Sequence, residues 1–263
     1  MEPRYITLKK NEENFFSYLD GSFSSEWRAL PEQSLNVNTA REQVTFRLIP
    51  MNQIHHPGWI VLLFKLFRLE WSSLSLGPVL ATYSYLAFSG QQLNHFNAIL
   101  AIIAVLVFHA AVFAMNDYRD HIKGVDRLSL KGGSQVIQQG WLSAQTVRRV
   151  GLTLFGLGSC VGLYLILKQP FFLMAVGLFT GVSVLGYSFY GQGLKYLGFG
   201  EVVAFFCFGP LLTYGFSRAA SYSHSWEILF LGLGFGFLSA LCLQSRQLEN
   251  IISDSQVGVK SLA

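Results

Sequence analysis

Residues 93–115 read LNHFNAILAIIAVLVFHAAVFAM, a stretch of 23 residues without a charged side chain. A helix needs about 20 mostly apolar residues to span the hydrocarbon core of a bilayer, because each residue advances it by about 1.5 Å. Residues 71–90 form a second uncharged stretch of sufficient length. Both are apolar on every side, whereas the strands of a membrane barrel alternate apolar and polar residues. The two stretches therefore predict membrane-spanning α-helices.

Four further apolar segments follow, at residues 150–167, 171–190, 202–216 and 228–243. The last two are short. Arg218 can extend the first of them by reaching the interface with its charged end, and the uncharged Gln244 and Ser245 can extend the other. We therefore expect an all-α fold, a polytopic transmembrane bundle of about six helices.

The composition agrees with a membrane protein. Charged residues make up 13% of the chain, where a soluble protein has about 25%. Seven of the 15 acidic residues precede residue 57, so the rest of the chain holds too few to cover a water-exposed surface. This excludes a soluble enzyme and a disordered chain. The net charge of +4 comes from basic residues that flank apolar segments, which indicates a lipid bilayer and no nucleic acid as the partner.

The basic residues also predict an orientation. If the N-terminus is cytoplasmic and six helices alternate, 17 of the 19 basic residues fall on the cytoplasmic side, and only Lys168 and Arg218 fall on the other. Short cytoplasmic loops carry an excess of Lys and Arg in membrane proteins. We therefore expect the loops after the second and fourth helices to face the cytoplasm.

Residues 1–56 differ from the rest, because they are polar and mixed in charge. We expect them to form a polar cytosolic N-terminal extension, followed by a transmembrane domain at residues 57–263. Two other interpretations stay open. Translation could start at Met51, or an aromatic cluster could dock an amphipathic helix on the membrane surface. The cluster consists of Phe15, Phe16, Tyr18, Phe23 and Trp27.

Polar residues gather where the second predicted helix ends. Asn116 and Asp120 are four residues apart and Asp117 and Asp120 are three apart, so a helix presents their oxygens on one face. Asp126 follows nearby, and three neighbouring carboxylates repel one another unless a cation lies between them. Oxygen ligands without a His or Cys pattern favour Mg²⁺. We therefore predict Mg²⁺ ligands at Asn116, Asp117, Asp120 and Asp126.

Cations surround these acids, namely Arg119, Lys123, Arg127 and Lys131, and the stretch Gly132-Gly133-Ser134 follows them. Cations and exposed backbone N–H groups beside a metal suit a diphosphate. An ordinary charged cytoplasmic loop would look similar, so charge alone leaves both interpretations open.

The stretch NDYRDHIKGVD at residues 116–126 resembles the first aspartate-rich motif of the UbiA-type intramembrane prenyltransferases. It has the Asn-Asp-Tyr-x-Asp…Gly-x-Asp form of the 1,4-dihydroxy-2-naphthoate polyprenyltransferases of menaquinone synthesis. The stretches KGGSQVIQQG at residues 131–140 and LKYLGFGEV at residues 194–202 agree with the same family. The resemblance runs from about residue 69 to the end of the chain.

The resemblance implies a second motif of two aspartates four residues apart, and residues 248–254 read LENIISD at that position. Asp254 matches, whereas Asn250 replaces the first aspartate and Glu249 replaces a usual arginine. An amide oxygen still ligates Mg²⁺ but brings less charge. The family has about nine membrane helices, so the resemblance also implies that the sequence is truncated or that further helices come from elsewhere.

The function implied is transfer of a polyprenyl group from polyprenyl diphosphate to an aromatic acceptor, with 1,4-dihydroxy-2-naphthoate expected. Asp117 and Asp120 would act with Mg²⁺, Lys195 would hold the acceptor carboxylate, and Tyr187 and Tyr190 would stabilise the allylic cation. The resemblance places the protein in a bacterial inner (cytoplasmic) membrane with its active site facing the cytoplasm.

Three alternatives remain. A related transferase could use another phenol, such as 4-hydroxybenzoate. A catalytically inactive truncated homologue would explain Asn250 and the missing helices. A transporter would use the acids as coupling sites, although such acids usually lie near the bilayer midplane.

Two smaller predictions concern helix contacts. His109 lies within the second helix and is either a functional polar residue or part of a hydrogen bond between helices. The pairs Gly158/Gly162 and Gly232/Gly236 predict close helix packing.

Overall fold

The structure is a computed structural model that describes residues 4–128, 132–184, 186–187, 194, 197–221, 225–251 and 255. The chain divides into two compact units. The first comprises Met1–Leu69, Phe113–Leu152 and Asn250–Gly258, and the second comprises Glu70–Val112, Thr153–Glu249 and Val259–Ala263. Two long helices, α4 (His95–Lys123) and α6 (Ala144–Lys168), each contribute to both units.

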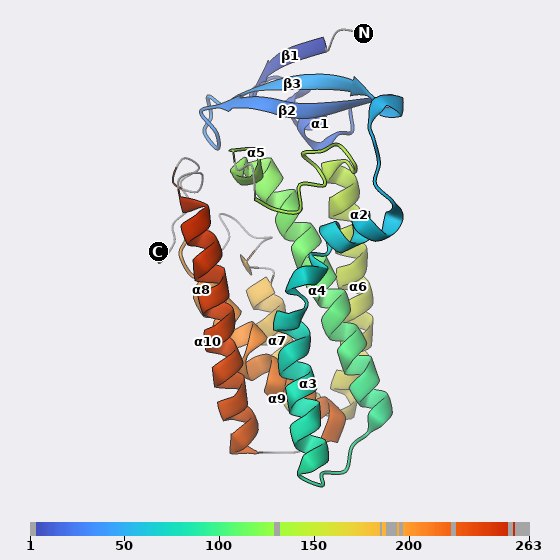
Figure 1. Ribbon diagram of the computed structural model, residues 1–263, viewed down its shortest axis with the longest axis vertical. Coiled ribbons are helices and arrows are strands. Elements are labelled where there is room, and N and C mark those ends of the chain that lie inside the picture. The colour runs from blue at the N-terminus through green and yellow to red at the C-terminus, as the bar shows by residue number, and fades with distance from the viewer. Residues whose placement is uncertain are drawn as a thin grey trace. The chain divides into compact units, whose positions relative to one another are not determined.

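The first unit begins with an antiparallel sheet of three strands, β1 (Arg4–Lys9), β2 (Trp27–Leu35) and β3 (Gln43–Pro50). The strand order is β1-β3-β2, with β3 in the centre (Figure 1). Val44 and Phe46 alternate with less buried residues along β3 and are fully buried, as expected of a strand with one face in a core. Helix α1 (Phe15–Asp20) contributes Phe15 and Leu19 to the same core.

The aromatic cluster of the N-terminal stretch belongs to this small fold. Phe15 is fully buried in the core, and Tyr18 stacks on Phe23 with ring centroids 4.1 Å apart. Trp27 lies on β2, where the Arg4 guanidinium sits 5.5 Å from its ring centroid. The alternative of one amphipathic membrane helix is therefore wrong, because α1 has only six residues and the cluster is distributed over a sheet and a helix.

The remainder of the first unit is helical. It contains η1 (Met51–Gln53), α2 (Trp59–Leu66), the last turns of α4, α5 (Val125–Leu128) and the first turns of α6. A second core joins α2, α4, the segment after α5 and α6, and it is built from Leu66, Ala114, Val136, Ile137, Ala144 and Val147. This core fixes the end of α4, which carries the predicted site.

The second unit is a helical bundle. Besides its parts of α4 and α6 it contains α3 (Ser73–Phe88), α7 (Pro170–Val184), α8 (Gly200–Phe208), α9 (Pro210–Ser221) and α10 (Trp226–Glu249), and η2 (Leu69–Trp71) leads into it. Its core is formed by Val79, Ala98, Ala101, Leu165, Leu173, Phe216, Ala219 and Ala220. Small residues are frequent in this core, which lets the helices approach closely.

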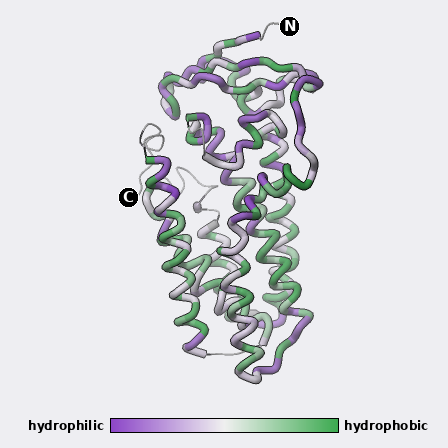
Figure 2. The backbone as a smooth tube through the Cα atoms, in the orientation of Figure 1, coloured by the Kyte–Doolittle hydropathy of each residue, from purple (hydrophilic) through white to green (hydrophobic). Residues whose placement is uncertain are grey.

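Within the described part of the chain, four helical stretches are long and apolar enough to cross a membrane, namely His95–Lys123, Ala144–Lys168, Gly200–Ser221 and Trp226–Glu249. Green apolar residues run along them in Figure 2. The other two predicted segments form shorter helices, α3 with 16 residues and α7 with 15. The helical fold class is confirmed, and the sheet is a minor addition that the sequence pattern did not predict.

Small residues make one close helix crossing in the second unit. A β-carbon placed on Gly232 would lie 2.8 Å from Pro210 Cα, and one on Gly236 would lie 2.7 Å from the Phe205 carbonyl oxygen. The packing predicted for this pair is confirmed. The Gly158/Gly162 prediction is right only at Gly158, which meets the Phe108 ring, because no heavy atom lies within 4 Å of a β-carbon on Gly162.

His109 forms a hydrogen bond between two helices. Its Nδ1 lies 2.8 Å from Ser75 Oγ of α3, and both residues are buried. This confirms the interpretation that assigned His109 to helix packing.

Candidate functional site

The last two turns of α4 carry the predicted acids. Asn116, Asp117 and Asp120 are buried, with 9%, 2% and 3% of their surfaces exposed. Asn116 Nδ2 donates a hydrogen bond of 2.8 Å to Asp120 Oδ2 across one helical turn. Buried carboxylates are costly unless cations or hydrogen-bond donors compensate their charge. Their burial therefore requires partners from other segments.

Arg68 supplies one such partner, since its guanidinium forms an ion pair and a hydrogen bond with Asp117 Oδ1. The guanidinium also lies 5.2 Å from the centroid of the Phe113 ring. Burial alone would lower the pKa of Arg68, but the charges of Asp117, Asp126 and Asp120 outweigh it, and the pKa is raised. Arg68 is thus a permanent cation among three acids.

The backbone of Arg68 is unusual, because its φ of +46° is left-handed. A residue with a β-carbon adopts this conformation at a cost of about 1–2 kcal/mol. The tight turn after α2 that this conformation provides directs the side chain to α4. The ion pair with Asp117 compensates for the strain.

The glycine-rich segment after α5 lies against the same acids. Ser134 N–H donates to Asp117 Oδ2 over 3.3 Å. Gly133 has a φ of +65°, and an added β-carbon would collide with the Asp126 carboxylate, lying 2.8 Å from its Cγ. Glycine is therefore required at this position on two grounds. The predicted association of residues 132–134 with the acids agrees with these contacts.

The ligand chemistry is that of a hard cation, because Asn116, Asp117, Asp120 and Asp126 offer only oxygen atoms. Over the described ranges, no group of three or more His, Cys, Asp or Glu side chains is placed so that it could hold a metal ion. Arg68 provides positive charge to these acids instead. The donor types thus fit Mg²⁺, and the metal assignment stays a prediction.

Arg127, one of the predicted diphosphate cations, contacts both the N-terminal sheet region and the end of α4. Its side chain is 1% exposed, and its Nη2 donates to Glu42 Oε1 over 2.5 Å. Arg119 and Lys123 are half-buried on α4. Lys131 lies outside the described residues. The contacts of Arg127 with Glu42 are therefore described, whereas diphosphate binding by Arg119, Lys123 and Lys131 stays a prediction.

The remaining predicted residues are spread over the chain. Asn250, half-buried, directly follows α10, and Tyr187 is half-buried in the second unit. Tyr190, Lys195 and Asp254 lie outside the described residues, so their assignments stay predictions.

Sequence reasoning missed three residues that the structure brings forward. Arg68 was counted only as a cytoplasmic charge, although its position just before a membrane segment was a usable signal. Glu42 had no distinguishing pattern. Glu201, within the quoted LGFGEV stretch, is 6% exposed, and among the described residues neither of its carboxylate oxygens has a hydrogen-bond partner.

Several known proteins are similar in sequence to this chain. A UbiA prenyltransferase domain-containing protein 1 from Xenopus tropicalis is 30% identical over 203 residues, which cover 73% of this chain and 56% of that protein. A 1,4-dihydroxy-2-naphthoate octaprenyltransferase from Mycobacterium tuberculosis is 29% identical over 169 residues, covering 63% of this chain and 56% of that protein. A protein of the same name from Haemophilus influenzae is 26% identical over 206 residues, covering 76% and 65%.

The chain thus spans between 56% and 65% of the length of these curated relatives. The sequence profile of the UbiA prenyltransferase family matches residues 75–263, which is more than half of the chain. This match contains the acids of α4, the glycine-rich segment and the LGFGEV stretch. The chain therefore belongs to the UbiA prenyltransferase family.

Proposed function

We propose that the protein transfers a polyprenyl group from its diphosphate to an aromatic quinone precursor, with 1,4-dihydroxy-2-naphthoate as the acceptor. The observation that carries this proposal is the buried set of three acids, Asp117, Asp120 and Asp126, next to Arg68 and a glycine-rich segment in a family of prenyltransferases. Two of the relatives are named as octaprenyltransferases of that acceptor.

The membrane setting suits such a donor. The chain is an integral membrane protein, since it belongs to this family and has four helical stretches that can span a bilayer. A polyprenyl chain dissolves in the hydrocarbon core, whereas its diphosphate stays at the polar boundary. The acids lie at the last turns of α4, where a spanning helix reaches that boundary. We further propose that this boundary faces the cytoplasm of a bacterial cell, as the distribution of basic residues favours.

The residues of the chain have distinct parts in this proposal. Asn116, Asp117, Asp120 and Asp126 would hold Mg²⁺, together with Asn250 and Asp254. Bound there, Mg²⁺ would neutralise charge on the departing diphosphate. Arg119, Lys123 and Lys131 would bind the phosphate oxygens. Arg68 pairs with Asp117 and orients its carboxylate, so that the side chain is preorganised before the donor arrives.

The chain would also have to bind the acceptor and exclude water from the reacting carbon. Its ring must attack the allylic carbon in a space without water, because water would otherwise take the prenyl group. Tyr187 and Tyr190 would face the developing cation with their ring faces. Lys195 would pair with the acceptor carboxylate, which is lost during the reaction.

The test is product formation in membranes that contain the full chain, supplied with dihydroxynaphthoate and a polyprenyl diphosphate over a Mg²⁺ titration. We expect prenylated product from the parent and none from Asp120→Ala. Product from Asp120→Ala at the parental rate would overturn the site. Transfer to 4-hydroxybenzoate alone would change the acceptor and keep the reaction class.

One observation favours a second candidate, a catalytically inactive membrane homologue. Asn250 carries no charge where the family motif has an acid. In that case no donor, acceptor or Mg²⁺ concentration would give product, although the parent is folded and inserted. Asn250→Asp separates the two, because an active enzyme with a weak second motif would then need less Mg²⁺.

A further inference from the structure

Glu42 is a buried carboxylate just before β3, with 2% of its side chain exposed. Its Oε1 accepts from Arg127 Nη2 over 2.5 Å and its Oε2 accepts from Lys10 Nζ over 2.9 Å. A carboxylate buried without partners would be strongly disfavoured. Both oxygens are paired here. One of the partners, Arg127, follows α4 in the sequence.

Arg127 connects this carboxylate to the end of α4. Its Nε donates to the His121 carbonyl oxygen over 3.0 Å and its Nη2 donates to the Ile122 carbonyl oxygen over 3.3 Å. These carbonyls belong to the last turn of the helix, where carbonyls lack their usual intrahelical partners. The His121 carbonyl also accepts from Gly124 N–H over 3.1 Å. Burial lowers the pKa of Arg127, and the Glu42 charge opposes that effect. Arg127 therefore caps α4 while Glu42 holds its guanidinium in place.

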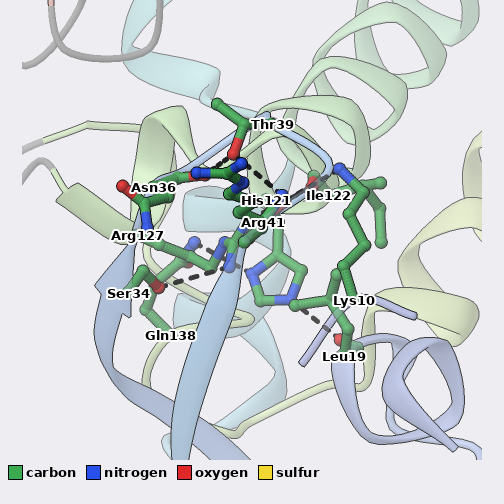
Figure 3. Close-up of polar contacts among 11 residues, drawn as sticks. Lys10, Leu19, Ser34, Asn36, Thr39, Arg41, His121, Ile122, Arg127 and Gln138 are labelled. Carbon is green, nitrogen blue, oxygen red and sulfur yellow. Dashed lines mark hydrogen bonds and ion pairs between the residues drawn. The ribbon is translucent and has the colours of Figure 1, made fainter. Parts of the chain in front are cut away.

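A second contact joins the sheet region to the same turn. His121 is buried, and its Nε2 donates to the Leu19 carbonyl oxygen over 2.9 Å (Figure 3). Ile122 packs against the core that contains Phe15 and Val44. Gly124, with a φ of +87°, lies so close to Val37 Cγ1 that a β-carbon would collide with it.

Residues that contact the sheet region and residues of the candidate site are neighbours in the sequence between positions 120 and 127. Asp120 directly precedes His121, and Asp126 directly precedes Arg127. A shift of either contact would move the neighbouring acid, and catalytic groups lose efficiency when they are displaced by about 1 Å. The family profile begins at residue 75, so Glu42 and the sheet lie outside the matched region.

We propose that the fold of residues 4–50 is a positioning module for the acids of α4 and α5, with Glu42 acting through Arg127 as its positioning residue. In this proposal Arg127 stabilises the end of α4, which carries the acids, and does not contact the diphosphate. The proposal rests on the proposed function for its effect on catalysis, whereas its structural part is independent of any activity.

The first experiment compares Glu42→Gln with the parent, using the full chain in membranes. The amide keeps the size of the side chain and removes its charge. We expect the Mg²⁺ requirement for prenyl transfer to rise roughly 10- to 100-fold, as for partners that orient metal ligands, with the acceptor KM unchanged. Glu32→Gln is the matched control, because Glu32 makes an exposed ion pair with Arg47 in the same sheet. An unchanged Mg²⁺ requirement in Glu42→Gln would overturn the proposal.

A double mutant separates positioning from direct diphosphate binding. If Glu42 acts through Arg127, the combination of Glu42→Gln and Arg127→Gln is no worse than the more harmful single change. If Arg127 contacts the diphosphate, the two losses multiply and the donor KM rises in Arg127→Gln alone. The second result would overturn the proposal.

Hydrogen–deuterium exchange supplies a measurement that needs no activity. In Glu42→Gln we expect faster exchange of amides in residues 116–128 and unchanged exchange in α10. Ser34→Ala, which removes only the hydroxyl that accepts from Arg127 Nη1 over 3.2 Å, should give a smaller change in the same direction. Parental exchange rates in both variants would refute the proposal that residues 4–50 position the acids of α4 and α5. If exchange changes while the parent forms no product, the proposed function fails and this inference stands.

Discussion

The two compact units differ in the partners that their buried polar side chains have. The first unit contains buried charged pairs, as in Arg68 with Asp117 and in Arg127 with Glu42. In the second unit the interactions are mainly neutral. Thr213 Oγ1 donates to the Ile228 carbonyl over 3.3 Å, and Ser239 Oγ donates to the Ala204 carbonyl over 3.1 Å.

The difference follows from the surroundings of each unit. Helices that cross a bilayer associate through close packing and short neutral hydrogen bonds, because a charge in hydrocarbon is costly. Charged pairs are kept where the chain needs charge for its chemistry. The comparison teaches that in this protein the buried ion pairs mark the candidate site and its support, whereas the glycines and hydroxyls mark the membrane bundle.

The largest effect is expected for Arg68→Ala, which tests whether the buried ion pairs stabilise the first unit. It leaves the buried Asp117 carboxylate without its guanidinium, and removal of one partner of a buried pair costs about 3–5 kcal/mol. We expect that loss in the free energy of unfolding, measured by thermal or denaturant unfolding in detergent. Arg68→Lys keeps the charge and should lose less. Parental stability in Arg68→Ala would show that the pair contributes nothing.

Gly133→Ala tests the close approach of the glycine-rich segment to Asp126. The left-handed backbone and the collision with the carboxylate together should cost about 3 kcal/mol. Gly156→Ala is a matched control in α6, because its β-carbon would meet open space. We expect the control to be neutral or slightly stabilising. Equal stabilities of the two variants would contradict the geometry of the segment.

Gly232→Ala examines the neutral crossing of the second unit. The new methyl group would meet the Pro210 backbone, and overpacking of this kind costs about 1–3 kcal/mol. Gly234→Ala, two residues along α10, has open space and serves as the control. The comparison uses unfolding in detergent, and a larger loss at Gly234 than at Gly232 would refute the crossing.

Glu201→Gln addresses the exception in the second unit, a buried acid whose oxygens accept no hydrogen bond from the described residues. Replacing it with a neutral amide removes the cost of burying charge and breaks no described contact. We expect a change below about 0.5 kcal/mol or a small gain in stability. A loss above that size would assign Glu201 a structural partner.

The sequence predicted the helical part of the fold well, because an apolar segment long enough to span a membrane satisfies its backbone hydrogen bonds by forming a helix. It also predicted that residues 132–134 accompany the acids, since the motif and the charges lie close together in the chain. Arg68 and Glu42 could not be paired with their partners in advance. Their contacts join residues 49 and 85 positions apart, and only the folded chain determines such pairs.

The sheet was missed for a related reason. β2 contains Pro31 beside an irregular register with β3, so the alternation of apolar and polar residues is interrupted. The break between α8 and α9 at Gly209 and Pro210 was also not foreseen, although Pro210 was visible in the sequence.

The pairing of Glu42 with Arg127 has a consequence for synthesis of the chain. The two residues are 85 positions apart, so at about 5–20 residues per second Arg127 leaves the peptidyl transferase centre about 4–17 s after Glu42. His121 follows Leu19 by 102 positions in the same way. During this interval the nascent sheet has Lys10 as the partner of Glu42 but lacks the guanidinium. The N-terminal fold therefore reaches its final stability only after residues 71–90 and the whole of α4 have been synthesised, which links its maturation to membrane insertion.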